Sequence, residues 1–258
     1  MDGSDYCNIC GGKVIRKRLT FRNLLTHFFE QFFDYDNKFI KTLIHLISKP
    51  QIVIDGYVNG LRKRYVNPVS FFAVALTLAG LQLFIARKFF PESLDLSAMV
   101  FGGAEEIANQ QMNNMLEYQS LLVMFNIPVY AFIAFIVFFT LKKYNYTEYL
   151  VLFLYTTAQM TFVFFIPQLI GTYMGYNIGQ MGYVVILIQI IYTAYCFKVI
   201  FNISFGGLIL RFMLFVLVSI FVILLIGILS ELIKIFFVYG SFEEYREAQK
   251  EILKTMQP

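Results

Sequence analysis

Long apolar stretches constrain this chain more than any other feature of its sequence. A helix needs about 20 mostly apolar residues to cross the roughly 30 Å hydrocarbon core of a bilayer. Five stretches meet that requirement, at residues 68–86, 120–141, 149–170, 182–201 and 208–230. The sequence therefore predicts an all-α fold, a polytopic transmembrane helical bundle of five spans.

The composition agrees with a lipid environment. Hydrophobic residues make up 58% of the chain and charged residues 15%, whereas soluble domains have about 45–50% and about 25%. We predict four parts. They are a CxxC-containing N-terminal segment at 1–19, amphipathic cytoplasmic or interfacial helices at 20–66, the five-span bundle at 67–239 and a polar C-terminal tail at 240–258.

Lysine and arginine are distributed unequally between the two ends of the predicted bundle. With five spans, fifteen of these residues fall on the N-terminal side and six on the other side. Because cytoplasmic segments carry the excess of positive charge, the N-terminus is predicted to be cytoplasmic and the C-terminus to be outside. We expect a multi-pass protein of the inner (cytoplasmic) membrane of a bacterium.

Residues 20–66 carry apolar side chains at helical spacing. The first stripe consists of Phe21, Leu24, Leu25, Phe28, Phe29, Phe32 and Phe33. Shorter stripes follow at 39–47 and 54–65, and none is long enough to span a bilayer. Helices with one apolar face and basic surroundings are typical of the membrane interface, so we predict that they lie there. The alternative is that the stripes pack together as a small helical domain.

Three basic residues, Arg62, Lys63 and Arg64, lie just before the first predicted span. One interpretation is an anchor on the cytoplasmic side. The other is a contact site for a lipid head group or for a partner, because each basic residue near anionic lipid contributes about 1 kcal/mol.

The same region contains a spaced signature, Y-x-x-G-x-R-x-x-Y-x-x-P. Its residues are Tyr57, Gly60, Arg62, Tyr65 and Pro68. It resembles the bacterial membrane family, mostly of Bacteroidota, catalogued as domain of unknown function 3667. The upstream segments CNICG and KRLTFRNLL are similar to that family's zinc-ribbon end. The resemblance implies no established activity.

A looser resemblance concerns architecture. A cytoplasmic N-terminal region, five spans and an external C-terminus are similar to the Yip-type five-span membrane proteins. This similarity carries an expectation about fold and none about function.

Cys7 and Cys10 form a CxxC pair, which is half of a zinc ribbon. A structural zinc site has four ligands, and no second CxxC follows in this chain. Two interpretations stay open: a vestigial turn with two free thiols, or zinc shared between two chains that each donate two thiolates. In the first case no cofactor is expected.

Residues that could carry catalysis are not found in a recognisable pattern, so no catalytic residue is predicted. Glu148 and Arg211 fall at span ends, where we expect them to anchor the helices in the interface. Four polar residues lie within predicted spans, namely Thr156, Thr157, Gln159 and Gln189. They are explained either by hydrogen bonds between helices or by a polar cavity.

These observations favour a non-enzymatic membrane protein that organises lipid or a partner protein through its cytoplasmic amphipathic region. The alternative is a small transporter or channel for an uncharged or lipidic solute. The two predict different bundles, the first well packed and the second with a cavity at its midplane. Expected partners are membrane lipid and either a second copy of the chain or another protein, and no nucleic acid.

Overall fold

The computed structural model describes residues 38–94, 118–233, 235–236 and 240–246, and within them it contains helices and no strands. In chain order the helices are α2 (Lys38–Ser48), α3 (Pro50–Val58), α4 (Pro68–Phe89), the short 3-10 helix η2 (Pro91–Leu94), α6 (Gln119–Val137), the 3-10 helix η4 (Phe139–Leu141), α7 (Tyr146–Tyr173), α8 (Ile178–Phe201) and α9 (Phe205–Ile233). The predicted helical-bundle fold class is confirmed.

Four of the described helices, α4, α7, α8 and α9, are long and apolar enough to cross a membrane. The second predicted span corresponds to α6, which has 19 residues and so is about 28 Å long. Its apolar part, Leu121–Val137, is shorter than the other four. A count of five spans therefore depends on α6 and stays a prediction.

Asparagine caps fix where three of these helices begin. The side chains of Asn67 and Asn177 each accept a hydrogen bond from the backbone N–H two residues later, at the starts of α4 and α8. At the start of α7, Asn145 and Glu148 form a reciprocal capping box. Such caps satisfy N–H groups that have no partner within the helix.

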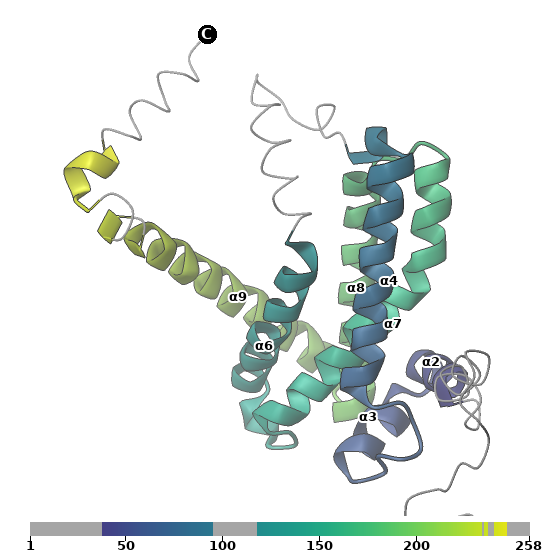
Figure 1. Ribbon diagram of the computed structural model, residues 1–258. Coiled ribbons are helices and arrows are strands. Elements are labelled where there is room, and N and C mark those ends of the chain that lie inside the picture. The colour runs from purple at the N-terminus through teal and green to yellow at the C-terminus, as the bar shows by residue number, and fades with distance from the viewer. Residues whose placement is uncertain (1–37, 95–117, 234, 237–239, 247–258) are drawn as a thin grey trace, which may run out of the picture.

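The helices form a bundle with two short helices at one end. In Figure 1, α4, α7 and α8 lie side by side, and α2 and α3 lie at their lower end. Helix α7 packs against α4, α6 and α8, so it is central to the bundle. Helix α9 contacts α6 and α8 near its beginning and then diverges from them.

Aromatic side chains join α6, α7 and α8 at the end where α3 lies. The rings of Phe138 and Phe197 stack with centroids 4.4 Å apart, and those of Tyr149 and Phe201 stack at 6.0 Å. Stacked pairs of this kind add to the free energy gained from burying their area. These stacked rings pack the end of the bundle where the α6–α7 loop and the end of α8 meet.

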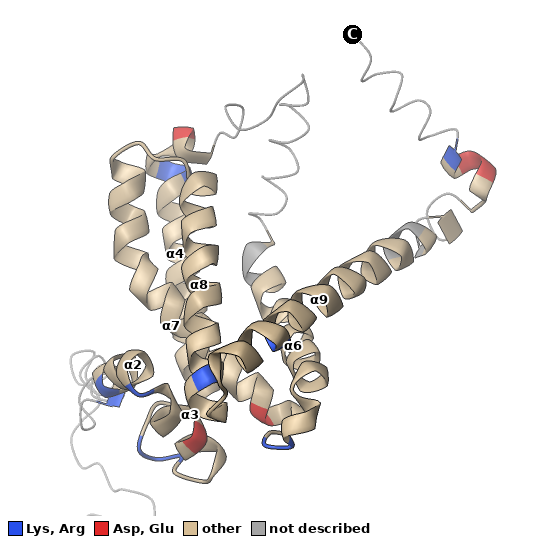
Figure 2. Ribbon diagram, turned by 180° about the vertical axis from the view of Figure 1, so that it is seen from behind, with Lys and Arg blue, Asp and Glu red and all other residues tan. Residues whose placement is uncertain are grey.

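Charges are concentrated at that same end. Figure 2 shows basic residues around α2, α3, the α6–α7 loop and the α8–α9 junction. These described residues are Lys38, Lys41, Lys49, Arg62, Lys63, Arg64, Lys142, Lys143, Lys198 and Arg211. At the other end of α4 lie Arg87 and Lys88.

Candidate functional site

Side chains from the long helices bind the backbone of α2. The Tyr192 hydroxyl of α8 donates to the carbonyl of Leu46 at 2.9 Å, and Gln159 Nε2 of α7 donates to the carbonyl of Leu43 at 3.1 Å. The Leu46 carbonyl lies in the last turn of α2, where carbonyls lack partners within the helix. The bundle thus provides the cap for this end of α2.

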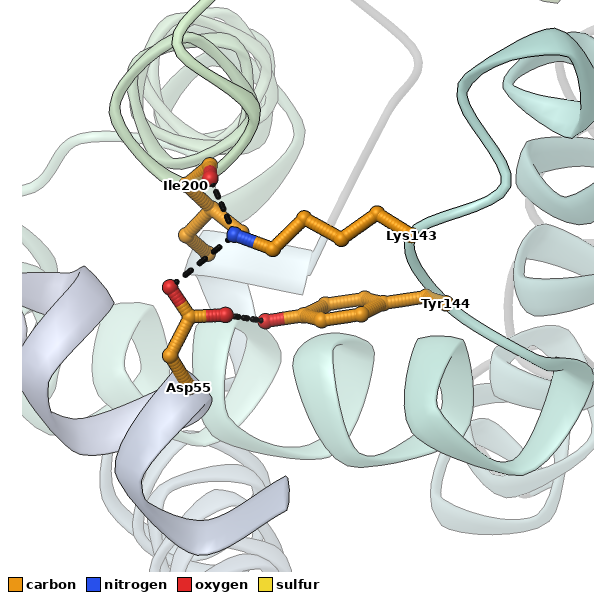
Figure 3. A network of polar contacts seen from close by, with 4 residues as sticks. All are labelled: Asp55, Lys143, Tyr144 and Ile200. Atoms are coloured by element: carbon orange, nitrogen blue, oxygen red, sulfur yellow. Dashed lines mark hydrogen bonds and ion pairs between the residues drawn. The ribbon is translucent and has the colours of Figure 1, made fainter. Parts of the chain in front are cut away.

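A polar network joins α3 to the rest of the protein (Figure 3). Lys143 Nζ lies 3.1 Å from Asp55 Oδ2 and also donates to the carbonyl of Ile200. The hydroxyl of Tyr144 donates to the other carboxylate oxygen, Asp55 Oδ1. The network therefore joins α3, the loop that precedes α7, and the last turn of α8.

The charges around this network favour the observed positions of Lys143 and Tyr144. Ile200 lies in the last turn of α8, where the carbonyls carry the negative end of the helix dipole, so the Lys143 ammonium is well placed there. The same ammonium lies over the rings of Tyr144 and Phe201. Burial raises the pKa of the Tyr144 hydroxyl above its ordinary value, and its hydrogen bond to Asp55 raises that pKa further.

The signature residues build the connection between α3 and α4. Gly60 has φ +100°, a conformation that side chains other than glycine's rarely adopt. Tyr65 is buried and forms a 2.8 Å hydrogen bond with His45 Nδ1 of α2. Pro68 occupies the first turn of α4, where its missing N–H costs nothing.

The remaining signature residues also make contacts within this connection. The Tyr57 hydroxyl accepts a hydrogen bond from Asn67 Nδ2 at 3.2 Å, and the Arg62 guanidinium lies 5.8 Å from the centre of the Tyr57 ring. Lys63 and Arg64 are exposed next to Arg62. The signature thus has a structural role in this chain. The three neighbouring basic side chains, Arg62, Lys63 and Arg64, are exposed on the protein surface.

A cavity of about 620 Å³ lies between α4, α6, α7, α8 and α9. This volume falls within the range of about 300–1,000 Å³ that is typical of ligand pockets. Most of the lining is apolar, with aromatic residues such as Phe72, Phe153 and Phe215. Polar groups line it as well, namely Gln82, Asn126, Tyr130, Thr157, Thr161, Gln168, Gln189, Thr193, Arg211 and Ser219.

Several of these polar groups bind one another. Gln82 Nε2 donates to Gln168 Oε1 at 2.8 Å, and Gln189 Nε2 donates to the Thr193 hydroxyl at 3.3 Å. The hydroxyl of Ser219 donates to a backbone carbonyl of its own helix at 2.7 Å. Because these donors already have partners, the walls of the cavity are compatible with an apolar occupant.

The four polar residues predicted within the spans lie in two places. Thr157 and Gln189 line the cavity. Thr156 and Gln159 are fully buried outside its lining, and Gln159 binds α2 instead. Two of the four residues thus line a cavity, Gln159 bonds to another helix, and Thr156 bonds to the Phe153 carbonyl of its own helix.

Comparison with known proteins finds a family that is similar to part of the chain. Residues 36–80 match the family described as Protein of unknown function (DUF3667). The resemblance predicted from the signature is confirmed. The DUF3667 match covers α2, α3 and the first part of α4, which includes Asp55 and the signature. Neither the search of curated proteins nor that of solved structures finds a match, and the Yip-type resemblance stays a prediction.

The matched residues 36–80, called the DUF3667 segment below, contribute to the cavity through α4. Phe72, Leu76 and Ala79 lie within the matched residues and line it. The segment therefore combines two structural features, the attachment of α2–α3 to the bundle and one wall of the cavity.

The predicted metal ligands Cys7 and Cys10 lie outside the described residues, as does the first apolar stripe. The third cysteine, Cys196, is buried in α8. In the part of the chain that the structure covers, no three His, Cys, Asp or Glu side chains gather as a metal site would require. Zinc shared between two chains stays a prediction.

Proposed function

We propose that this protein is a non-enzymatic membrane protein that binds a lipid inside its helical bundle. The observation that supports this most is the cavity of about 620 Å³, with apolar walls contributed by five helices. In a membrane, the molecules that reach such a cavity in quantity are those of the bilayer. A lipid tail matches the lining because it buries apolar surface without requiring hydrogen bonds.

The divergence of α9 supports entry from the bilayer. In the first 25 residues of this helix, no residue is buried against the rest of the chain. One side of α9 nevertheless lines the cavity, through residues that recur about once per helical turn: Leu208, Arg211, Phe212, Phe215, Ser219 and Ile223. A helix that is apolar all round and packed on one side only has lipid as its natural neighbour on the others.

Native mass spectrometry of the purified protein tests this function. Ala194 lines the cavity from α8, so Ala194→Trp should fill part of it and lower the amount of retained lipid. Ala73→Trp is the matched control, because Ala73 is exposed on α4 and is not part of the lining. Equal lipid retention by both variants and the unchanged protein would count against the cavity as the binding site.

A second candidate function is organisation of the membrane surface by α2, as expected from the sequence. Ile40, Ile44 and Ile47 are exposed on one side of this helix, while Leu46 is buried against the bundle. Exposed isoleucines at i, i+4 and i+7 beside a basic cluster favour contact with the membrane interface. The basic residues gather at the same end of the bundle as α2, which favours a cytoplasmic location for this end.

Fluorescence can test this candidate directly because the chain contains no tryptophan. A tryptophan placed by Ile44→Trp should be quenched by lipids that carry bromine near the head group. The control Asn59→Trp places the probe in the exposed turn after α3, where less quenching is expected. Equal quenching at both positions would argue against an interfacial α2.

A further inference from the structure

One lining residue of the cavity differs from all the others in charge. Arg211 is half-buried in α9, about two turns from the start of this helix, which follows the end of α8 where Lys198 lies. One of its donors, Nη1, binds the carbonyl of Gly207 at 3.2 Å, and its guanidinium lies 5.9 Å from the centre of the Phe138 ring. A guanidinium has five N–H donors, so this environment leaves most of its hydrogen-bonding capacity available.

The carboxylates near this end of the bundle are engaged elsewhere. Asp55 is paired with Lys143 and Tyr144, and Glu148 accepts a hydrogen bond from the backbone N–H of Asn145 at 2.7 Å. Among the residues that the structure describes, Asp55 and Lys143 form the only ion pair, so Arg211 has no acidic partner there. An uncompensated guanidinium beside an apolar cavity is a position suited to an anion.

Arg211 lies near the beginning of α9, where a membrane-spanning helix approaches the lipid head groups. Its Cα is about 9 Å along α9 from Phe205, and a long basic side chain reaches back toward the interface from such a position. Basic pockets between transmembrane helices on the cytoplasmic side are typical sites for anionic lipid head groups. The apolar lining then continues from Arg211 along α9 to Ile223.

We propose that the cavity selects an anionic phospholipid, whose phosphate binds Arg211 while an acyl chain lies along the inner side of α9. This inference rests on the proposed lipid-binding function and adds the class of lipid and the residue that recognises it. Arg211, predicted from the sequence to anchor a span end, thereby acquires a second role.

To test this proposal, the purified protein is mixed with equimolar phosphatidylglycerol and phosphatidylcholine that have matched acyl chains. Native mass spectrometry then measures the ratio of the two lipids that remain bound. We expect the unchanged protein to prefer the anionic lipid about fivefold, the effect of one basic residue near an anionic lipid. Arg211→Gln should abolish this preference, and Arg211→Lys should retain most of it.

One control variant separates recognition by Arg211 from general attraction to positive charge, and one further measurement tests whether the contact is ionic. Lys198→Gln removes an exposed base at the same end of the bundle and should leave the preference unchanged. If Arg211→Gln does not assemble, the salt dependence of the preference in the unchanged protein decides, because an ionic contact weakens as salt is added.

The outcomes distinguish this inference from the function on which it rests. Equal binding of both lipids by the unchanged protein, a preference that survives Arg211→Gln, or a preference that salt does not weaken would overturn the inference while lipid binding stands. Lipid retention that Ala194→Trp does not reduce would overturn the binding function itself. A loss of preference in Arg211→Gln, with total lipid retained, is the result we expect.

Discussion

Lys143 and Asp55, 88 residues apart in the sequence, form an ion pair with 3.1 Å between Nζ and Oδ2. Asp55 belongs to the segment that matches DUF3667, and Lys143 to the loop before α7. Because Lys143 also binds the last turn of α8, this pair connects the matched segment to the end of α8. The Lys143 side chain is 36% exposed and the Asp55 side chain 25%, so solvent screens their attraction in part.

A double-mutant cycle on this pair measures its contribution. We expect Asp55→Asn and Lys143→Gln to be coupled by about 0.5–1 kcal/mol in the free energy of unfolding, as for partly exposed ion pairs. Lys142→Asn is the control, since the exposed neighbour Lys142 lies outside the network drawn in Figure 3. A coupling of Asp55 to Lys142 as large as that to Lys143 would contradict the assigned pairing.

The raised pKa of Tyr144 predicts a dependence of stability on pH. Above the ordinary tyrosine pKa of 10.0, the unfolded chain releases this proton while the folded protein retains it. Stability from this group is therefore fully present below about pH 10 and is lost as pH rises further. Unfolding measured between neutral and alkaline pH should show a smaller alkaline loss in Tyr144→Phe. An identical pH profile in both proteins would show that Tyr144 does not cause the alkaline loss of stability.

Removing the hydroxyl of Tyr192 should loosen α2. Tyr192→Phe leaves the Leu46 carbonyl without its partner, which should cost about 1 kcal/mol and raise hydrogen exchange in the last turn of α2. Tyr195→Phe is a matched control on the same helix, because the Tyr195 hydroxyl is more exposed and its contact with Ser48 is longer, 3.4 Å. Equal effects of both changes would contradict the role given to Tyr192.

Cysteine accessibility tests the predicted topology. With the three native cysteines replaced, Lys142→Cys and Arg246→Cys should react with impermeant reagents from opposite sides of the membrane, the first from the cytoplasm. Labelling from the same side would show that the number of crossings between the two positions is even. The five-span, N-in and C-out arrangement would then be wrong.

The fold could be predicted from the sequence because hydropathy acts over a whole helix. The predicted spans at 149–170 and 182–201 correspond to α7 and α8, each extended by three or four residues at its beginning. The extensions come from the caps Asn145 and Asn177. Their polar side chains had placed these residues in loops, although Asn145 followed by Glu148 has the spacing of a capping box.

The site was less predictable because its contacts join distant parts of the chain. Asp55 is the single acidic residue between Asp36 and Glu92, a signal that could have marked it as paired. Its partners Lys143 and Tyr144 carry no local pattern that points to it. For the same reason, Gln159 and Gln189 looked alike in the sequence, and only the packing of α2 separates their roles.

Photo-crosslinking with a lipid that carries a diazirine in its acyl chain tests the central claim most directly, since it reports where a lipid lies. We expect the labelled residues to lie in both α7 and α9 and to be residues that line the cavity, such as Thr157 and Phe215. This labelling should be reduced in Ala194→Trp and retained in Ala73→Trp. Labelling confined to exposed residues such as Leu214 and Leu217 of α9, unchanged in Ala194→Trp, would show that lipid surrounds the bundle without entering it.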